Sequence, residues 1–122
     1  MKTKRKANKS SIGVDIESIE RFEALDKKGS NRFIAKIFTK KEVQYCFSKK
    51  TPAQHMAVRF AAKEAIIKAI SSLGKKAPAF NAIDIINDAK GIPSVKLKGY
   101  NIKISLAHCG YKAIAFVMVE IE

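Results

Sequence analysis

The stretch TPAQHMAVRFAAKEAIIKAISSLG, residues 51–74, decides the fold because it predicts the longest helix of the chain. Thr51 is a favourable N-cap, Pro52 suits the first helical position, and Gln54 stands where a capping-box partner would. Gly74 is a typical residue for ending a helix. The segment between these signals predicts about six helical turns.

The two sides of this predicted helix differ in composition. At about 100° per residue, one side is apolar and is expected to face the core; it holds Ala62, Ala65, Ile66, Ala69, Ile70 and Leu73. The opposite side collects Phe60, Lys63, Glu64, Ile67 and Ser71, with Lys68 at its edge. Glu64 and Lys68 could form an exposed ion pair worth roughly 0.2–0.5 kcal/mol. Phe60 and Ile67 instead favour a second buried surface there, against a ligand or another subunit.

Residues before the long helix predict one strand and three shorter helices. Residues 11–18 alternate as a strand, with Ile12, Val14 and Ile16 on one face and Gly13 and Asp15 on the other. Ser18 can cap a helix over residues 19–29 that Gly29 ends, and residues 31–38 predict another helical segment. The run TKKE at 39–42 is a capping box that opens a short helix.

After residue 80 the apolar period changes to two, which predicts strands. Residues 83–88 and 92–97 flank Ala-Lys-Gly as a hairpin. Residues 100–107 alternate cleanly, the run HCGY at 108–111 turns the chain, and residues 112–122 are apolar enough for a central strand. The predicted fold class is α+β, with one long helix and shorter helices packed on a mainly antiparallel sheet.

Composition indicates one globular domain with an affinity for anions. The 122 residues are 47% hydrophobic, which suffices for a core, and we expect a basic flexible tail at 1–10 followed by a single domain at 11–122. Twenty-four Lys and Arg residues against eleven acidic ones leave a net charge of +13. Such a charge attracts nucleic acid, an anionic membrane, a phosphorylated metabolite or an acidic protein, and composition alone does not choose among these.

Other sequence features predict a cytoplasmic location. The two cysteines, Cys46 and Cys109, form no C-x-x-C motif or disulfide framework. The basic N-terminus is followed by no apolar stretch typical of a secretory signal, and no segment approaches the ~20 apolar residues of a membrane span.

Two carboxylates stand in positions that local structure does not favour. Asp15 lies among β-branched residues of a predicted strand, where it could cap the following helix. Glu64 lies beside lysines on the predicted helix. A hard cation such as Mg²⁺ prefers one or two carboxylates together with waters and phosphate oxygens. Asp15 and Glu64 therefore form a candidate metal pair, although no spacing rule shows that they meet.

Three blocks of the sequence resemble the signature motifs of a known family. They are GVDIESIERF (13–22), RFAAKEAIIKA (59–69) and ISLAHCGYKAIAFVMVE (104–120). Their order and spacing resemble the holo-acyl-carrier-protein synthases, the small bacterial 4′-phosphopantetheinyl transferases. The likeness covers residues 11–121, and segments 31–42 and 80–95 also fall in the expected order.

This resemblance implies a reaction. Coenzyme A would donate its phosphopantetheine arm to a serine of apo-acyl carrier protein, release adenosine 3′,5′-bisphosphate and so support fatty acid biosynthesis. By residue matching, Asp15 and Glu64 would bind Mg²⁺, and Lys68 would stabilise or protonate the leaving phosphate. The serine proton would be removed by Glu64 or by a water.

The resemblance also assigns binding residues. Arg59, Lys63, Lys68 and His108 match positions expected near the phosphates of coenzyme A, with Gly74 and Lys75 in the loop after the long helix. Arg21 and Arg32 match basic positions expected to hold the acidic carrier protein. The family is typically a homotrimer with its active sites between subunits. Without the resemblance, His108 would be interpreted as a histidine of the hairpin turn.

Some residues depart from the family pattern. Ile67 stands where a small hydroxyl residue is common, and Ala107 replaces the usual Ser or Thr before the histidine. Two alternative functions fit part of the sequence. The first is a small basic nucleic-acid-binding module, which fits the charge. The chain lacks an aromatic stacking platform, however, and carries acids on the relevant surface, so no specific nucleic acid is expected as a partner. No membrane is expected as a partner either. An inactive carrier-protein-binding relative would keep the fold and lose the chemistry.

Overall fold

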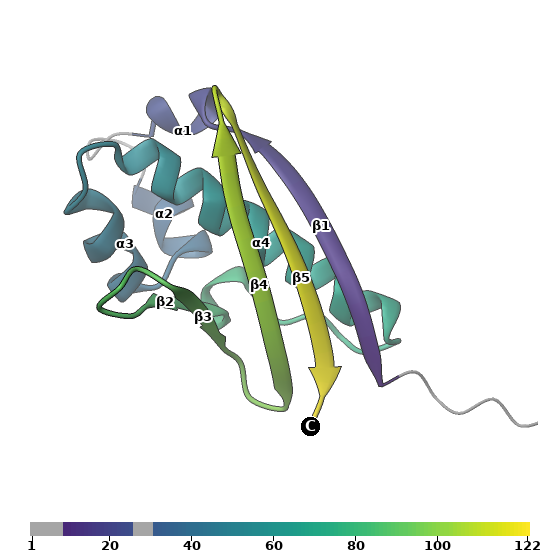
Figure 1. Ribbon diagram of the computed structural model, residues 1–122. Helices are drawn as coiled ribbons and strands as arrows, with labels where there is room; N and C mark the ends of the chain where they lie inside the picture. The colour runs from purple at the N-terminus through teal and green to yellow at the C-terminus, as the bar shows by residue number, and fades with distance from the viewer. Residues whose placement is uncertain (1–8, 26–30) are drawn as a thin grey trace, which may run out of the picture.

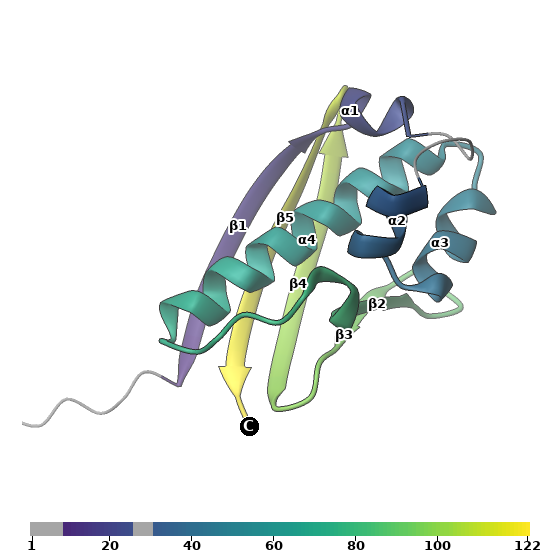
Figure 2. The ribbon, with the colours of Figure 1, turned by 180° about the vertical axis from the view of Figure 1, so that it is seen from behind.

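The long helix predicted from the sequence is the packing centre of the structure. Helix α4 covers Pro52–Ser72, 21 residues, and runs across one face of a sheet (Figure 2). The computed structural model describes residues 9–25 and 31–122. The other elements, in chain order, are β1 Ser10–Ser18, α1 Glu20–Glu23, α2 Asn31–Ile37, α3 Lys40–Phe47, the 3₁₀ helix η1 Phe80–Ala82, β2 Asp84–Asn87, β3 Pro93–Lys96, β4 Tyr100–Cys109 and β5 Lys112–Ile121.

The main sheet is antiparallel, with strand order β1-β5-β4. The apolar strand β5 is central, as its sequence predicts. Its register places Ala115 opposite both Asp15 of β1 and Leu106 of β4. Strands β2 and β3 form a separate antiparallel hairpin, and β3 lies against β4. The predicted α+β class is confirmed.

One face of the main sheet packs against α4. Strand β5 contributes four side chains that are fully buried there: Ala113, Ala115, Val117 and Val119. Strand β1 approaches α4 so closely that a Cβ atom on Gly13 would lie 2.0 Å from the carbonyl oxygen of Ala65. Only glycine allows this approach of strand to helix. It brings Asp15, which follows on the same face of β1, next to the middle of α4.

The opposite face of the sheet carries no helix (Figure 1). We call its apolar patch the open sheet face; it consists of Ile12, Val14, Ile16, Ile114, Phe116 and Met118, which are 40–61% exposed. The predicted alternation of β1 is confirmed, and its β-branched residues are on the face turned away from the helix. A contiguous apolar patch of this kind is typical of a protein–protein interface.

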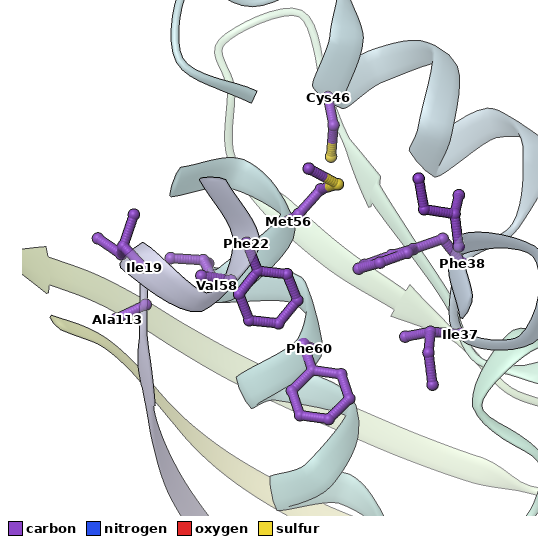
Figure 3. Packing of buried hydrophobic residues seen from close by; sticks show 11 residues of the cluster. Ile19, Phe22, Ile37, Phe38, Cys46, Met56, Val58, Phe60 and Ala113 are labelled. Atoms are coloured by element: carbon purple, nitrogen blue, oxygen red, sulfur yellow. The ribbon is translucent and has the colours of Figure 1, made fainter. Parts of the chain in front are cut away.

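The other side of α4 is covered by the short helices α1, α2 and α3 (Figures 1 and 2). Phe60 is 6% exposed and packs against Phe22, Phe33 and Phe80, with ring centroids 5.5–6.3 Å apart. Figure 3 shows this core, with Phe22 and Phe60 close together below Met56 and Cys46. The prediction that Phe60 faces away from the core is therefore wrong. Phe60 and Lys63 are buried by other parts of the same chain, whereas Glu64 and Ile67 of this helical face are half-buried and Ser71 is exposed.

Several predicted boundaries also need correction. Helix α1 ends at Glu23 and its N-cap is Ile19, with no side-chain cap, so Ser18 does not cap it. The capping box of Thr39 and Glu42 is confirmed, whereas the Thr51 side chain makes no capping hydrogen bond. Strand β1 begins at Ser10, inside the predicted tail. Residues 1–8 and the predicted helix stop Gly29 lie outside the described residues. Among the helices of the described segments, none is long and apolar enough to cross a membrane.

Candidate active site

Asp15 and Lys68 meet where β1 passes the middle of α4. The Lys68 ammonium donates to Asp15 Oδ1 at 2.9 Å and to the Val14 carbonyl oxygen at 3.3 Å. The hydrogen bond with Asp15 raises the pKa of Lys68 above its ordinary value. The second Asp15 oxygen, Oδ2, is buried and has no hydrogen-bond partner among the residues that the structure describes. A buried carboxylate oxygen without a partner is costly, and it is suited to accept a ligand that the chain itself does not supply.

Two further carboxylates lie close to Asp15. Glu64, on α4, is half-buried; both it and Asp15 act electrostatically on Lys68 and on Glu17. Glu17 follows Asp15 on the same face of β1. Burial, the adjoining Asp15 carboxyl group and the negative charge of Glu64 raise the pKa of Glu17 to about 7. The guanidinium of Arg21, 3.2 Å from Glu17 Oε1, opposes this rise.

This carboxylate group fits a hard divalent cation. Across residues 9–25 and 31–122, no set of three or more His, Cys, Asp or Glu side chains is arranged to hold a metal ion alone. Magnesium commonly takes only one or two protein carboxylates and completes its shell with water and phosphate oxygens. Asp15 and Glu64 supply that donor type, and the partnerless Asp15 Oδ2 supplies a free coordination position.

A second group of functional side chains lies on the other side of α4. Arg59 is 2% exposed; its guanidinium donates to Asn87 Oδ1 and to the His55 carbonyl oxygen and lies 4.3 Å from the Tyr45 ring centroid. Its Nε is buried without a partner. The guanidinium borders a pocket of about 400 Å³ between α4, β4 and the β2–β3 hairpin. A cation held in this way is suited to bind phosphate.

His108 also lines this pocket. It belongs to β4, which continues to Cys109, so the interpretation as a turn residue is wrong; the turn begins at Gly110. Its Nε2 is 2.8 Å from Gln54 Nε2. The Gln54 side chain thus contacts His108 and does not serve as the capping partner of Thr51. Ala107 also lines the pocket.

The two groups do not share one site within a single chain. Glu17, Ala113 and His108 stand in one row across the sheet, with β1 and β4 as its two edges. Two interstrand spacings separate the edges by about 10 Å, and α4 packs over the strand between them. We call the group of Asp15, Glu17, Glu64 and Lys68 the carboxylate side, and the group of Arg59, Asn87 and His108 the pocket side.

Among the residues predicted to contact phosphate, Lys63 has the environment least suited to that role. Its side chain is 0% exposed, and its ammonium donates to Glu42 Oε1 at 2.6 Å, to the Ile37 carbonyl oxygen at 2.7 Å and to the Phe80 carbonyl oxygen at 3.0 Å. Burial lowers its pKa. All three ammonium hydrogens are used inside the protein, so Lys63 has none left for a ligand.

The remaining predicted residues lie at the surface. Gly74, with φ of 74°, ends α4 as predicted, and it and Lys75 are exposed beyond the C-terminus of the helix, away from the pocket. Arg21 is held above Phe60, 5.2 Å from the ring centroid. Arg32 is exposed on α2. A larger pocket of about 730 Å³ near α1 is mainly apolar and contains none of the predicted metal or phosphate ligands, so charge favours the smaller one.

Comparison with known proteins identifies the family. The model of the 4′-phosphopantetheinyl transferase superfamily matches residues 11–117. The chain belongs to this superfamily. The holo-[acyl-carrier-protein] synthase of Thermodesulfovibrio yellowstonii is 40% identical over 110 residues, which cover 88% of this chain and 96% of that protein. The corresponding protein of Protochlamydia amoebophila is 40% identical over 115 residues, covering 88% and 94%.

Solved structures of these transferases share the fold. The holo-(acyl-carrier-protein) synthase from Bacillus anthracis, in complex with CoA (3′,5′-ADP), aligns with a TM-score of 0.76 at 29% identity and covers 92% of this chain and 96% of that one. The enzyme from Helicobacter pylori, in complex with coenzyme A, also has a TM-score of 0.76, at 30% identity and with coverage of 89% and 99%. The predicted family, fold and enzyme class, a transferase of the holo-acyl-carrier-protein synthase type, are confirmed.

Three residues near the site were missed by the sequence reasoning. Gln54 was interpreted as a partner in a helix cap. Asn87 lies in a predicted hairpin and belongs to no motif. Glu17 lies two residues after Asp15, to which the metal-binding role was given. Only for Glu17 was a signal present, since residues 15 and 17 of a strand point to the same face.

Proposed function

We propose that the protein transfers the 4′-phosphopantetheine group from coenzyme A to a serine of apo-acyl carrier protein, with Mg²⁺, in support of fatty acid biosynthesis. The observation that carries this proposal is the pair of sites flanking α4. One side offers carboxylates with a free buried oxygen, and the other offers a basic pocket beside a buried arginine. A pyrophosphate ester bound with a divalent cation needs both kinds of group.

In the proposed reaction the serine oxygen attacks the phosphorus that carries pantetheine. The bond from that phosphorus to the oxygen shared with the neighbouring phosphate breaks, and adenosine 3′,5′-bisphosphate leaves with the bonding electrons. Glu64, directly or through a water, would accept the serine proton. The exposed ammonium of Lys68 would stabilise the negative charge on the leaving phosphate.

Asp15 and Glu64 would hold Mg²⁺ through their carboxylate oxygens. When bound, the cation would neutralise negative charge on the pyrophosphate. Arg59 and His108 would bind and orient phosphate groups of the coenzyme from the pocket side. Their placement about the same pocket supports this role.

Arg21 and Arg32 are proposed to contact the acidic carrier protein. The guanidinium of Arg21 is already oriented by Glu17 and by the Phe60 ring, which lowers the entropy cost of binding. The net charge of +13 would accelerate encounter with an acidic partner and make the association rate fall with salt.

A homotrimer with active sites between subunits is part of the proposal. The carboxylate and pocket sides lie at opposite edges of the sheet, so a neighbouring copy could bring its pocket side to the carboxylate side of the first. The open sheet face supplies an apolar surface of the kind that such assembly buries. Phe116 lies in the middle of this face, and the Phe116→Asp variant should sediment as a monomer. Ser105, its cross-strand neighbour, is already polar, so the Ser105→Asp variant should sediment as the assembled protein.

The test of the activity is direct. The protein is incubated with apo-acyl carrier protein, coenzyme A and Mg²⁺, and the carrier is examined by mass spectrometry for an added phosphopantetheine group. Glu64→Gln should lose this product, while the same substitution at exposed Glu120 should retain it. No product from the unaltered protein at any Mg²⁺ concentration would contradict the proposal. Carrier binding without transfer would identify an inactive relative.

A further inference from the structure

We infer that the buried Glu42–Lys63 pair is a positioning device for the coenzyme pocket, because it fixes the β2–β3 hairpin that supplies one pocket wall. This inference rests on the proposed function for the identity of the ligand. The residues concerned are not in contact with the pocket themselves, so their role would be exerted through Asn87 and Arg59.

The pair is saturated with hydrogen bonds. Glu42 Oε1 accepts from the Thr39 amide at 2.8 Å and from the Lys63 ammonium at 2.6 Å, and Oε2 accepts from the Ile85 amide at 2.9 Å. Both charged side chains are fully removed from solvent. A buried ion pair keeps its geometry only where further hydrogen bonds satisfy each partner, as they do here.

These bonds connect five elements that are distant in sequence. The Lys63 ammonium reaches the end of α2 at Ile37 and η1 at Phe80. Glu42 lies in the first turn of α3, where its amide donates to the N-cap Thr39, and its carboxylate accepts from Ile85 of strand β2. The Thr39 hydroxyl adds a bond to Asp84 Oδ1, 2.9 Å away, at the start of β2. The hairpin is thus tied to the helices at its first two residues.

The same strand is tied to α4 a second time, at the pocket. Asn87, at the end of β2, accepts from Arg59, which lies one helical turn before Lys63. The four residues from Arg59 to Lys63 rise about 6 Å along α4, and the two residues from Ile85 to Asn87 rise about 6.6 Å along β2. The two attachment points are therefore about equally spaced on the helix and on the strand. Strand β2 therefore runs antiparallel to α4, held through Glu42 at Ile85 and directly at Asn87.

This arrangement links the buried pair to ligand binding. Asn87, Gly91 and Pro93 of the hairpin line the same pocket as His108. Loss of the Lys63 charge would leave Glu42 buried without its counter-ion, so its carboxylate would either take up a proton or move toward solvent. Either change weakens its buried hydrogen bond to the Ile85 amide. Asn87 would then shift, and Arg59 would lose the acceptor that orients its guanidinium.

Lys63→Met is the principal test, with titration calorimetry of coenzyme A binding and steady-state kinetics as the two readouts. We expect the KM for coenzyme A to rise about 10-fold while kcat at saturating coenzyme A stays within about 3-fold of its original value. Glu42→Gln combined with Lys63→Met removes both charges, and should return the affinity to within about 3-fold of the unaltered protein. A direct phosphate ligand could not be rescued in this way.

Asp84→Ala provides a milder variant in case Lys63→Met does not fold. It removes only the Thr39–Asp84 bond, and should raise the KM for coenzyme A about 3-fold without altering kcat. Unchanged coenzyme A affinity in folded Lys63→Met, or in Asp84→Ala, would overturn the inference. So would a double variant as defective as Lys63→Met alone. Failure of the unaltered protein to transfer phosphopantetheine would instead overturn the proposed function, and calorimetry would still judge the positioning role.

Discussion

Helix α4 carries two lysines five residues apart, and each forms an ion pair with a carboxylate from another element. Lys63 and Glu42 are 2.6 Å apart and both side chains are 0% exposed. Lys68 and Asp15 are 2.9 Å apart, with side chains that are 55% and 12% exposed. The first pair has every hydrogen bond satisfied, whereas the second leaves Asp15 Oδ2 without a partner.

The difference is the one expected between a pair that stabilises the fold and a pair proposed to bind a ligand. Burial lowers the pKa of Lys63, while the hydrogen bond with Asp15 raises that of Lys68. A buried, saturated pair resists exchange because either partner would be left uncompensated. A pair at the surface is worth little to stability, so Lys68 can turn to a phosphate at small cost.

The largest effect expected from this comparison is on stability. Lys63→Met should lower the free energy of unfolding by about 3–5 kcal/mol, because Glu42 is left as an unpaired buried charge. Lys68→Met is the matched control and should change it by less than about 1 kcal/mol. Urea unfolding followed by circular dichroism measures both. Equal losses in the two variants would remove the distinction between the pairs.

The next effect concerns catalysis. Lys68→Met should reduce kcat for phosphopantetheine transfer by roughly 100-fold, as expected when one group that stabilises transition-state charge is removed. Its binding of coenzyme A should fall much less, since Arg59 and His108 remain in the pocket. Rate measurements at saturating coenzyme A separate these effects. A variant whose kcat is unchanged would show that Lys68 is only a surface ion-pair partner.

The smallest effect is a pH dependence on the carboxylate side. The pKa of Glu17 is raised from 4.5 to about 7, so the folded chain binds this proton more tightly than the unfolded chain does. Its stabilising contribution is present below about pH 4.5 and is lost as pH rises to about 7. The free energy of unfolding should therefore decline between those pH values, and Glu17→Gln should remove this decline. We expect the decline to be roughly 1 kcal/mol, because the site borders solvent and solvent screens its charges. Thermal midpoints at pH 5 and pH 8 test this; an unaltered slope would contradict the Glu17 assignment.

Much of the fold could be predicted because its signals are local. The Pro52 start and Gly74 stop of α4, the Thr39–Glu42 capping box and the alternation of β1, β4 and β5 all depend on residues within a few positions of each other. Burial of Lys63 and Phe60 was not predictable in the same way. Their helical face is apolar in part, and whether it contacts solvent or α1–α3 depends on tertiary packing.

The site was predicted in its residue types and only partly in its arrangement. Arg59 and His108, both matched to positions near the coenzyme phosphates, line one pocket. Lys68 contacts Asp15, whereas the sequence suggested Glu64 as its ion-pair partner and Glu64 as the neighbour of Asp15. The apolar sequence of residues 112–122 predicted a central strand, and β5 does lie between these two groups. The sequence did not predict which strand would pair with each edge of β5, because strand order is set by long-range pairing. The separation of the two groups on the β1 and β4 edges was therefore seen only in the structure.

The most direct test of the account is complementation between two inactive variants. Asp15→Asn damages the carboxylate side and His108→Ala the pocket side, and each alone should give little transfer of phosphopantetheine. When the two are co-expressed, mixed assemblies contain interfaces with an intact carboxylate side from one chain and an intact pocket side from the other. We predict that transfer activity reappears in the mixture. Mixed assemblies that remain as inactive as the separate variants would contradict an active site shared between subunits.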